Sequence, residues 1–474
     1  MSIKKQVIEG FGWNFGASQV LLVARFFVGI ALARILMPED FGKFAYMNSI
    51  ITMLFILRGF GFDSYVVQCD KDKLRVFGGT AVLLNGVLCI AVFFIALAVG
   101  IFGVEREFFL MFLVLLVFHA VENLLFVFHS FIQKELLYKK MALLNFFSSI
   151  FSMATGVLLA FQGFGIWSLI WMTAVRSATS VLLSIIYSPY YTKPVFSAAA
   201  AKDTWNYGKY NMLASFTGVS FSHTDNIIVE RSLGTVTLGF YSRAYSLARI
   251  FNQVVGSVVV RVAGPLFSKF KYERDKLSRI YNDFSTIMFR VNLGFYLILG
   301  CVAPDFIELV YTAKWLPAVP AIRMFLIFAL LNPLVGMTRR AFLNTGRSKP
   351  VGIAQVVLVG VLLITLVPLI KLFGLLGAAI AVNISIIACF VLMIFFLNKI
   401  LDANFKQILI KPVFVALLIA LIYLLTNRIF LPERSWLRLL THSVIIGGLY
   451  VGGIILMERA YLAALLKEIK LANA

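Results

Sequence analysis

Apolar segments long enough to cross a lipid bilayer follow one another along nearly the whole chain of 474 residues. A membrane-spanning helix needs about 20 consecutive, mostly apolar residues. Fourteen segments meet that condition: 13–33, 42–63, 77–101, 108–130, 142–161, 164–187, 208–230, 236–262, 284–303, 320–341, 351–370, 374–397, 412–430 and 438–457. The sequence therefore predicts an all-α integral membrane protein with no separate soluble domain.

The chain is strongly basic, with a formal net charge of +21 at pH 7, although only 14% of its residues are charged. Such a charge is typical of nucleic-acid-binding proteins. Here, however, the basic residues lie in short loops or inside the spans, so no nucleic-acid partner is expected. The four cysteines are scattered, which indicates neither a disulfide framework nor a metal site.

The distribution of Lys and Arg predicts the orientation, because cytoplasmic loops carry an excess of these residues. With the N-terminus in the cytoplasm, 25 of them fall on the cytoplasmic side and 9 on the other. This bias predicts that both ends of the chain are cytoplasmic. The last outer loop, with Arg428, Arg434 and Arg438, is the exception.

Residues 11–46 resemble residues 208–243 when the two stretches are aligned without a gap, at an offset of 197 positions. Seven of the 36 positions are identical, among them Asn14 on Asn211 and Gly42 on Gly239. Each stretch begins a series of similar spans, which indicates a duplicated helical unit. We therefore predict four parts. Residues 1–190 form an N-terminal six-helix bundle, and 191–206 form a cytoplasmic inter-bundle linker. Residues 207–400 form a C-terminal six-helix bundle, and 401–474 form two extra spans with a cytoplasmic tail.

Nine basic residues remain inside or at the edges of the spans: Arg25, Arg58, Arg176, Lys209, Arg243, Arg249, Arg261, Arg290 and Arg323. A charge at the bilayer centre costs about 2.5–3.5 kcal/mol, so such side chains face a partner or water rather than lipid. The acids at comparable depth are too few to pair with all of them. The excess predicts a water-accessible cationic cavity, and the planar fork of arginine suits phosphate in particular.

Four of these arginines are candidates for substrate binding in the cavity. Arg25 and Arg58 lie deep in the first pair of spans, while Arg243 and Arg249 lie in the eighth span, where Arg249 shares one side with the polar Asn252. The other deep arginines are better explained by snorkelling to the interface or by capping helix carbonyls; these are Arg176, Arg261 and Arg290. Arg323 is assigned to neither group.

Polar residues other than arginine supply further candidates. Asn14 and Asn211 belong to matching stripes on the first and seventh spans, which either line the cavity or allow close helix packing. Asp225 lies on the second stripe and is a candidate ion- or proton-coupling residue. Glu122 is the other coupling candidate; with His119, three residues earlier, it forms either a proton relay or a local hydrogen-bonded pair.

Motifs for catalysis are missing from the sequence. It has no GxxxxGK[ST] phosphate loop, no His/Cys/Asp cluster with metal-ligand spacing and no nucleophile beside an evident base. We therefore expect a protein that is not an enzyme and that uses neither a cofactor nor a metal. The motif Pro38-Glu39-Asp40 predicts a helix start, because proline fits the first turn and acids favour the positive end of the helix dipole.

Three stretches resemble the Wzx-type polysaccharide flippases of the MOP superfamily: ALARILMPEDFGKFAYMNSI, RGFGFDSYVVQ and TDNIIVERSLGTVTLGFYSRAYSLARIFNQ. The similarity is greatest to the exopolysaccharide and O-antigen branch. It implies two six-helix bundles related by a parallel repeat around a central cavity, plus two C-terminal helices. The related peptidoglycan-precursor flippases use arginines of their first, second and eighth helices in that cavity, which implies this role for Arg25, Arg58 and Arg249.

The resemblance also implies a function. Members translocate undecaprenyl-pyrophosphate-linked oligosaccharides across the bacterial inner membrane by alternating access, for exopolysaccharide, O-antigen or capsule biosynthesis, and polysaccharide polymerase or assembly proteins are the further partners. Two alternatives remain. A multidrug/cation antiporter of the same superfamily would favour an acidic cavity, and a membrane glycan polymerase or ligase typically needs a large outer loop.

Overall fold

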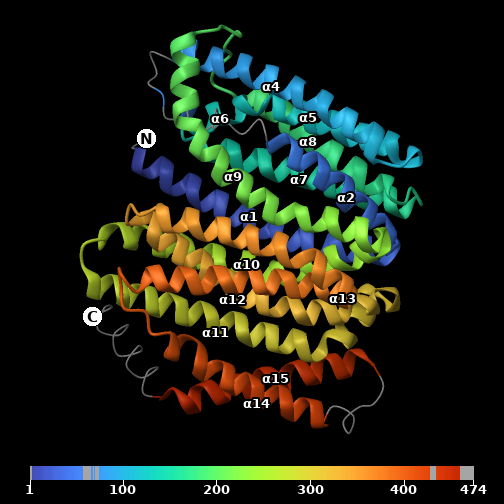
Figure 1. Cartoon of the computed structure of the whole chain (residues 1–474), viewed down its shortest axis with the longest axis vertical. Helices are drawn as coiled ribbons and strands as arrows, with labels where there is room; N and C mark the ends of the chain where they lie inside the picture. Colours follow the sequence, from blue (N-terminus) through green and yellow to red (C-terminus); the bar gives the residue numbers. More distant parts are fainter. Residues whose placement is uncertain (1–2, 57–65, 68, 70–73, 427–433, 460–474) are drawn as a thin grey trace. The chain divides into compact units, whose positions relative to one another are not determined.

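The computed structural model describes residues 3–56, 66–67, 69, 74–426 and 434–459. Every regular element within these residues is a helix, as Figure 1 shows. Ten of the described helical stretches are long and apolar enough to cross a membrane. The predicted all-α membrane fold is therefore confirmed. Packing between the helices divides the chain into a first unit, Met1–Ser242, and a second unit, Arg243–Ala474.

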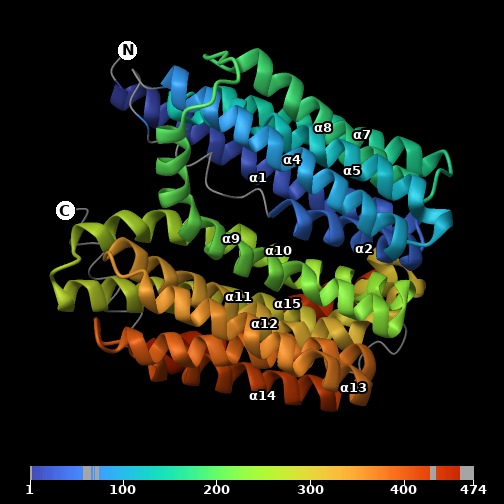
Figure 2. The ribbon, with the colours of Figure 1, turned by 45° about the horizontal axis from the view of Figure 1, so that its top comes forward.

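The first unit contains α1, α2, α4 to α9 and the beginning of α10. Helix α7 packs against both α1 and α8, α5 packs against α4 and α8, and α9 packs against α2 and α4. Figure 2 shows α4, α5, α7 and α8 side by side. The bounds are α1 (Ile3–Ile35), α2 (Pro38–Phe55), α4 (Leu74–Gly103), η3 (Arg106–Phe108), α5 (Phe109–Leu124), α6 (Phe126–Lys134), α7 (Tyr138–Phe161), α8 (Trp167–Tyr187), α9 (Ala198–Leu233) and α10 (Thr235–Lys269).

The second unit holds the rest of α10 and the helices that follow it. Helix α11 lies against α12, α14 and α15, so the two C-terminal helices are attached to the unit mainly through α11. The bounds are α11 (Arg274–Phe306), η4 (Ile307–Tyr311), η5 (Ala313–Ala318), α12 (Val319–Asn344), α13 (Lys349–Leu397), η6 (Lys406–Ile410), α14 (Lys411–Thr426) and α15 (Trp436–Met457).

Each predicted span has a helix among the described residues once α13 is counted as two. Helix α13 is kinked at Gly374, where φ is +57°, a conformation that favours glycine. This kink separates the predicted spans 351–370 and 374–397. Within the residues that the structure describes, α2, α9 and α10 are not among the ten apolar stretches.

The start of α2 confirms the prediction from Pro38-Glu39-Asp40. Pro38 occupies the first helical turn, and the backbone N–H of Met37 donates to Asp40 Oδ2 at 2.9 Å. Glu39 and Asp40 place negative charge at the N-terminal end of α2, where the helix dipole favours it. Helix α9 begins at Ala198, inside the segment predicted as a linker, because the Ser197 hydroxyl accepts from the Ala200 N–H and caps it.

The repeat has a physical counterpart in the first unit, where the starts of α2 and α10 cross. A Cβ on Gly42 would overlap the carbonyl oxygen of Thr235, and a Cβ on Gly239 would overlap that of Pro38. Gly42 and Gly239 are equivalent in the repeat, and so are Pro38 and Thr235, since both pairs differ by 197 positions. The contact is thus reciprocal, as a two-fold relation between equivalent elements requires.

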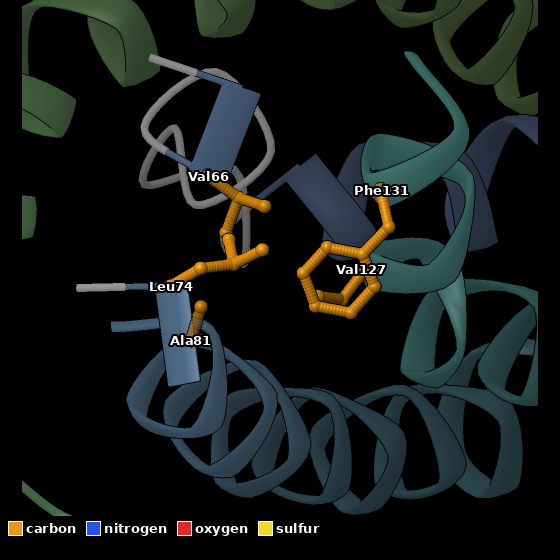
Figure 3. Packing of buried hydrophobic residues seen from close by; sticks show 5 residues of the cluster. All are labelled: Val66, Leu74, Ala81, Val127 and Phe131. Atoms are coloured by element: carbon orange, nitrogen blue, oxygen red, sulfur yellow. The ribbon is translucent and has the colours of Figure 1, made fainter. Parts of the chain in front are cut away.

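A cluster of buried apolar side chains joins the beginning of α4 to α6. Val66, Leu74, Ala81, Val127 and Phe131 form it, and each is at most 3% exposed; Figure 3 shows these five side chains. Lys134, at the end of α6, donates from Nζ to the carbonyl oxygens of Val66 and Cys69. Val66 and Cys69, which precede α4, are therefore attached to α6 by both apolar packing and a charged donor.

Ion pairs in the second unit account for the basic loop that was an exception to the predicted orientation. Asp305, 3% exposed at the end of α11, lies 3.2 Å from Arg438 and 3.7 Å from Arg434, and Glu308 also pairs with Arg434. Two arginines of that loop are therefore neutralised by α11 and η4. Because Arg434 and Arg438 are held by carboxylates, they are weak indicators of which side of the membrane the loop occupies.

Arg290 is paired with a buried acid, so the prediction that it snorkels to the interface is wrong. Its guanidinium lies 2.5 Å from Glu458, with side-chain exposures of 10% and 2%. The sequence places Glu458 beyond the last span, but α15 returns it to α11. A second, exposed pair holds the start of α11: Arg274 donates from Nε and Nη2 to Asp402, at 3.1 and 2.8 Å, which keeps the pKa of Asp402 below its usual range.

Substitution of either crossing glycine tests the α2–α10 contact. Gly42→Ala or Gly239→Ala must push the two helices apart, and overpacking of this kind costs about 1–3 kcal/mol. We expect a clear drop in the melting temperature of the protein in detergent. Gly360→Ala on α13 is the control, because no heavy atom lies within 4 Å of its added Cβ, and its melting temperature should not fall. A wild-type melting temperature for Gly42→Ala would contradict the contact.

Asp305 and Glu308 provide a second test, because they differ in burial. Asp305→Asn leaves the poorly exposed Arg438 without its carboxylate, and breaking a buried pair on one side costs about 3–5 kcal/mol. Glu308→Gln breaks a more exposed pair, for which about 0–1 kcal/mol is typical. Thermal unfolding should therefore show a much larger loss for Asp305→Asn. Equal losses would mean that burial does not govern this network.

Candidate functional site

Three of the predicted cavity residues have side chains outside the described part of the chain. Arg58 lies in the segment 57–65, which the structure does not describe. Asn14 and Asn211 lie on α1 and α9, as predicted, but their side chains are not described. Arg25, Glu122 and Asp225 can be placed in the first unit, and Arg243 and Arg249 in the second.

Arg25 is held by a neutral partner rather than by an acid. It projects from α1 and donates from Nη2 to Ser149 Oγ of α7 at 2.9 Å. Its side chain is exposed, and the like charge of Arg176 on α8 acts on it. Within the described residues no carboxylate pairs with Arg25. Because a guanidinium has five N–H donors, Ser149 orients this group and leaves most of its donors free for an anion.

Glu122 and His119 make their hydrogen bonds to neighbouring helices rather than to each other. Ser177 of α8 donates to Glu122 Oε2 at 2.5 Å, and His119 Nε2 lies 3.2 Å from Asn48 Oδ1 of α2. The prediction of a local hydrogen bond between Glu122 and His119 is therefore wrong. The charges of Glu122 and Arg176 both act on the His119 ring. Together with Arg25 and Ser149, these residues form what we call the N-terminal polar network, which joins α1, α2, α5, α7 and α8.

Asp225 belongs to a different group of contacts, between α2, α9 and α10. Its carboxylate is 1% exposed and accepts from the Tyr241 hydroxyl at 2.6 Å and from the backbone N–H of Asn226 at 2.8 Å. On either side of Asp225 in α9, the Asn226 amide donates to Ser49 Oγ of α2 at 2.9 Å, and His223 Nδ1 lies 3.0 Å from the same oxygen. These bonds attach α9 to both α2 and α10.

Arg249 and Arg243 lie on α10 in the second unit. The Arg249 guanidinium is 5.3 Å from the ring centroid of Tyr245, and Tyr245 in turn stacks on Phe328 of α12. A cation above an aromatic face is attracted by the ring but keeps its charge, so the ring positions Arg249 without neutralising it. Within the described residues Arg249 has no carboxylate partner. Arg243 is close enough to Tyr311 of η4 for its charge to act on that phenol.

A polar pocket of about 570 Å³ lies within the first unit, where the turns α1–α2, α4–η3 and α9–α10 meet. Its charged lining consists of four carboxylates and two cations: Glu39, Glu105, Glu107, Glu230, Lys43 and Arg231. Lys43 pairs with Glu39 at 2.6 Å, and Arg231 donates to the Gly103 carbonyl at 3.1 Å. Because the acids outnumber the bases, this pocket does not suit a phosphate.

Several residues of these groups were missed in the sequence. Ser149 and Ser177 are short polar residues in apolar helices, where such residues usually serve close packing, and Asn48 is one of several polar residues of α2. Tyr245 is one aromatic residue among many. A usable signal was the neighbouring pair Arg176-Ser177 in an otherwise apolar span, since a charge and a hydroxyl side by side there require partners.

The fold defines a class of protein: a polytopic all-helical membrane protein with arginines set inside its helical units. Residues 31–320, more than half of the chain, match the model of the family described as polysaccharide biosynthesis protein. The chain therefore belongs to the polysaccharide biosynthesis protein family, and the resemblance found in the sequence is confirmed.

Individual relatives agree with this assignment. The teichuronic acid biosynthesis protein TuaB of Bacillus subtilis (strain 168) is 23% identical over 354 residues, 73% of each chain. The succinoglycan biosynthesis transport protein ExoT of Rhizobium meliloti (strain 1021) is 29% identical over 285 residues, 58% of this chain and 56% of that protein. The solved structure of the lipid II flippase MurJ in an inward closed conformation has the same fold, with a TM-score of 0.77 at 14% identity over 95% of this chain and 99% of that one.

The hydrogen bond to Asp225 can be tested by removing one hydroxyl. Tyr241→Phe removes one of the donors to a buried carboxylate, and an unsatisfied buried polar atom costs about 1–3 kcal/mol. We expect a lower melting temperature than for Tyr191→Phe, the control, whose side chain is 66% exposed and donates to a backbone carbonyl. Equal melting temperatures for the two variants would exclude a structural role for the Asp225–Tyr241 bond.

Proposed function

We propose that this protein translocates oligosaccharides linked to undecaprenyl pyrophosphate from the cytoplasmic to the outer leaflet of the bacterial inner membrane. The observation that carries the proposal is that Arg25 and Arg249, within the described residues, have neutral partners and no carboxylate. A guanidinium kept unneutralised at membrane depth is costly. Binding an anionic substrate there would offset that cost. The family membership and the MurJ fold support the same substrate class.

The chemistry of the arginines fits a pyrophosphate. Each guanidinium can present two parallel N–H donors to two phosphate oxygens, and the Ser149 bond to Arg25 fixes the direction of that fork. We also propose that Arg58 and Arg243 bind the phosphates of the substrate and that Asn14 and Asn211 donate to its sugar hydroxyls. The prenyl chain can remain in the hydrocarbon, so the protein needs polar surface for the head group alone.

Two carboxylates, Glu122 and Asp225, are candidates for coupling transport to an energy source. We propose Glu122 rather than Asp225 as the group that couples transport to an ion or proton. Asp225 is fully engaged by Tyr241 and Asn226, whereas Glu122 is only half-buried and lies in the N-terminal polar network beside His119 and Arg176. A cation or proton bound at Glu122 would change the charge that acts on His119. Transport by alternating access is typical of transporters built from repeats.

Charge and loop length disfavour the two alternatives. A multidrug/cation antiporter needs acids to receive cationic substrates, but the intramembrane charges here are mostly arginines. A glycan polymerase or ligase typically needs a large outer loop, and the longest outer connection between the predicted spans is only residues 304–319. We also propose that both termini are cytoplasmic and that a polysaccharide polymerase takes up the product.

The decisive experiment locates the lipid-linked repeat unit in a strain that lacks this gene but keeps the rest of its glycan pathway. An impermeant glycan label reports which leaflet holds the repeat unit. We expect it to accumulate on the cytoplasmic side, and expression of the wild-type gene to restore its outward appearance. Arg25→Ala should lower outward labelling at least tenfold at normal protein levels, because the fork that receives the pyrophosphate is gone.

Three variants sharpen this test. Arg25→Lys keeps the charge but loses the fork and should recover only part of the activity, while Ser149→Ala should retain most of it. Arg34→Ala, on the same helix but near its end and exposed, is the matched control and should export normally. Normal outward labelling in the deletion strain, with only polymerisation lost, would overturn the flippase proposal in favour of an enzyme.

A further inference from the structure

An apolar groove of about 480 Å³ lies within the second unit, between α11, α12 and α14. Its walls are aliphatic over most of their length, and Arg323 is the one charged residue in its lining. All three helices are long and apolar enough to cross a membrane, and lining residues such as Leu417 and Leu424 are more than 60% exposed. The groove therefore opens toward the hydrocarbon of the bilayer.

Arg323 marks one end of the groove. The Arg323 Nε, near the start of α12, donates to the carbonyl of Gly300 at the end of α11, at 2.9 Å. The end of α14 lies at the same end of the groove, because the charge of Asp305, just beyond Cys301 in α11, acts on Tyr423. This end is lined by Gly300, Cys301, Arg323, Tyr423 and Leu424. The opposite end is apolar. From Val413 to Leu424 the groove follows α14 for about 16 Å at 1.5 Å per residue, roughly half the thickness of the hydrocarbon core.

The charge of Arg323 is not neutralised by the nearby acids. Asp305 and Glu308 are engaged by Arg434 and Arg438, and within the described residues no carboxylate pairs with Arg323. Its side chain is exposed, and only one of its donors is used, by Gly300. A cation that faces lipid is costly, and the remaining N–H groups can bind a phosphate as a charge-assisted pair.

We propose that this groove binds one acyl chain of an anionic phospholipid whose phosphate rests on Arg323. The length of the groove matches one leaflet, and its walls exclude a polar ligand. Its single charge selects a lipid with net negative charge, because the ammonium of a zwitterionic head group would be repelled by Arg323. The site does not depend on the glycan substrate, and it gives Arg323, which the transport function leaves unexplained, a partner.

Native mass spectrometry of the purified full-length protein tests the proposal. Phosphatidylglycerol and phosphatidylcholine with identical acyl chains are titrated separately, and the affinity of the first bound lipid is measured. We expect phosphatidylglycerol to bind at least fivefold more tightly. Arg323→Gln should remove that preference, and Ala420→Phe, which fills the groove, should weaken both lipids. Lys371→Gln removes an exposed cation from α13, and this control should bind as the wild type does.

Size-exclusion profiles and melting temperatures confirm that each variant is folded before its affinity is compared. Unchanged phosphatidylglycerol binding by Arg323→Gln, or by Ala420→Phe, would overturn the proposal. Undecaprenyl phosphate is titrated in parallel. If it displaced phosphatidylglycerol at equal concentration, and if Ala420→Phe abolished its binding, the groove would belong to the lipid tail of the transported substrate, and the phospholipid proposal would be wrong.

Discussion

The cost of keeping a charged side chain at membrane depth governs this structure. Each buried or lipid-facing charge needs a partner, and the chain supplies partners of three kinds. Carboxylates neutralise Arg290 of α11 and Arg438 of α15 in the second unit. Hydroxyl or aromatic groups orient Arg25 and Arg249 without neutralising them. A backbone carbonyl binds one donor of Arg323. The kind of partner separates arginines that hold helices together from arginines that remain available to an anion.

The same distinction applies to the acids. Asp225 and Asp305 are almost fully buried, and each is committed to specific donors. Removing those donors would leave a carboxylate unsatisfied in a poorly solvated place. Glu122 is less buried and lies among groups that respond to its charge. Structural and functional carboxylates in this protein can therefore be told apart by their burial and by the number of donors that hold them.

Backbone contacts in the first unit are as restrictive as its charges. Gly42 and Gly239 allow the starts of α2 and α10 to cross at a distance that no other side chain permits. The polar residues of α2 and α9, Ser49 with Asn226, then bond a few turns away. Small residues that admit close approach, followed by hydrogen bonds between helices, are the usual means of association where no hydrophobic driving force exists between helices in lipid.

The sequence by itself determined the helical class, the succession of spans, the repeat and the family, because the length and polarity of a membrane helix are local properties set by the bilayer. It also identified Arg25 and Arg249 as unusual, since an arginine in an apolar segment is conspicuous without any structure. Only the tertiary structure decided which charges are paired. Glu458 reaches Arg290, and Asp305 reaches Arg438, across more than 100 residues of sequence. Likewise, Ser149 became the partner of Arg25 only when α7 packed on α1. Such pairing depends on helix packing, which hydropathy does not encode.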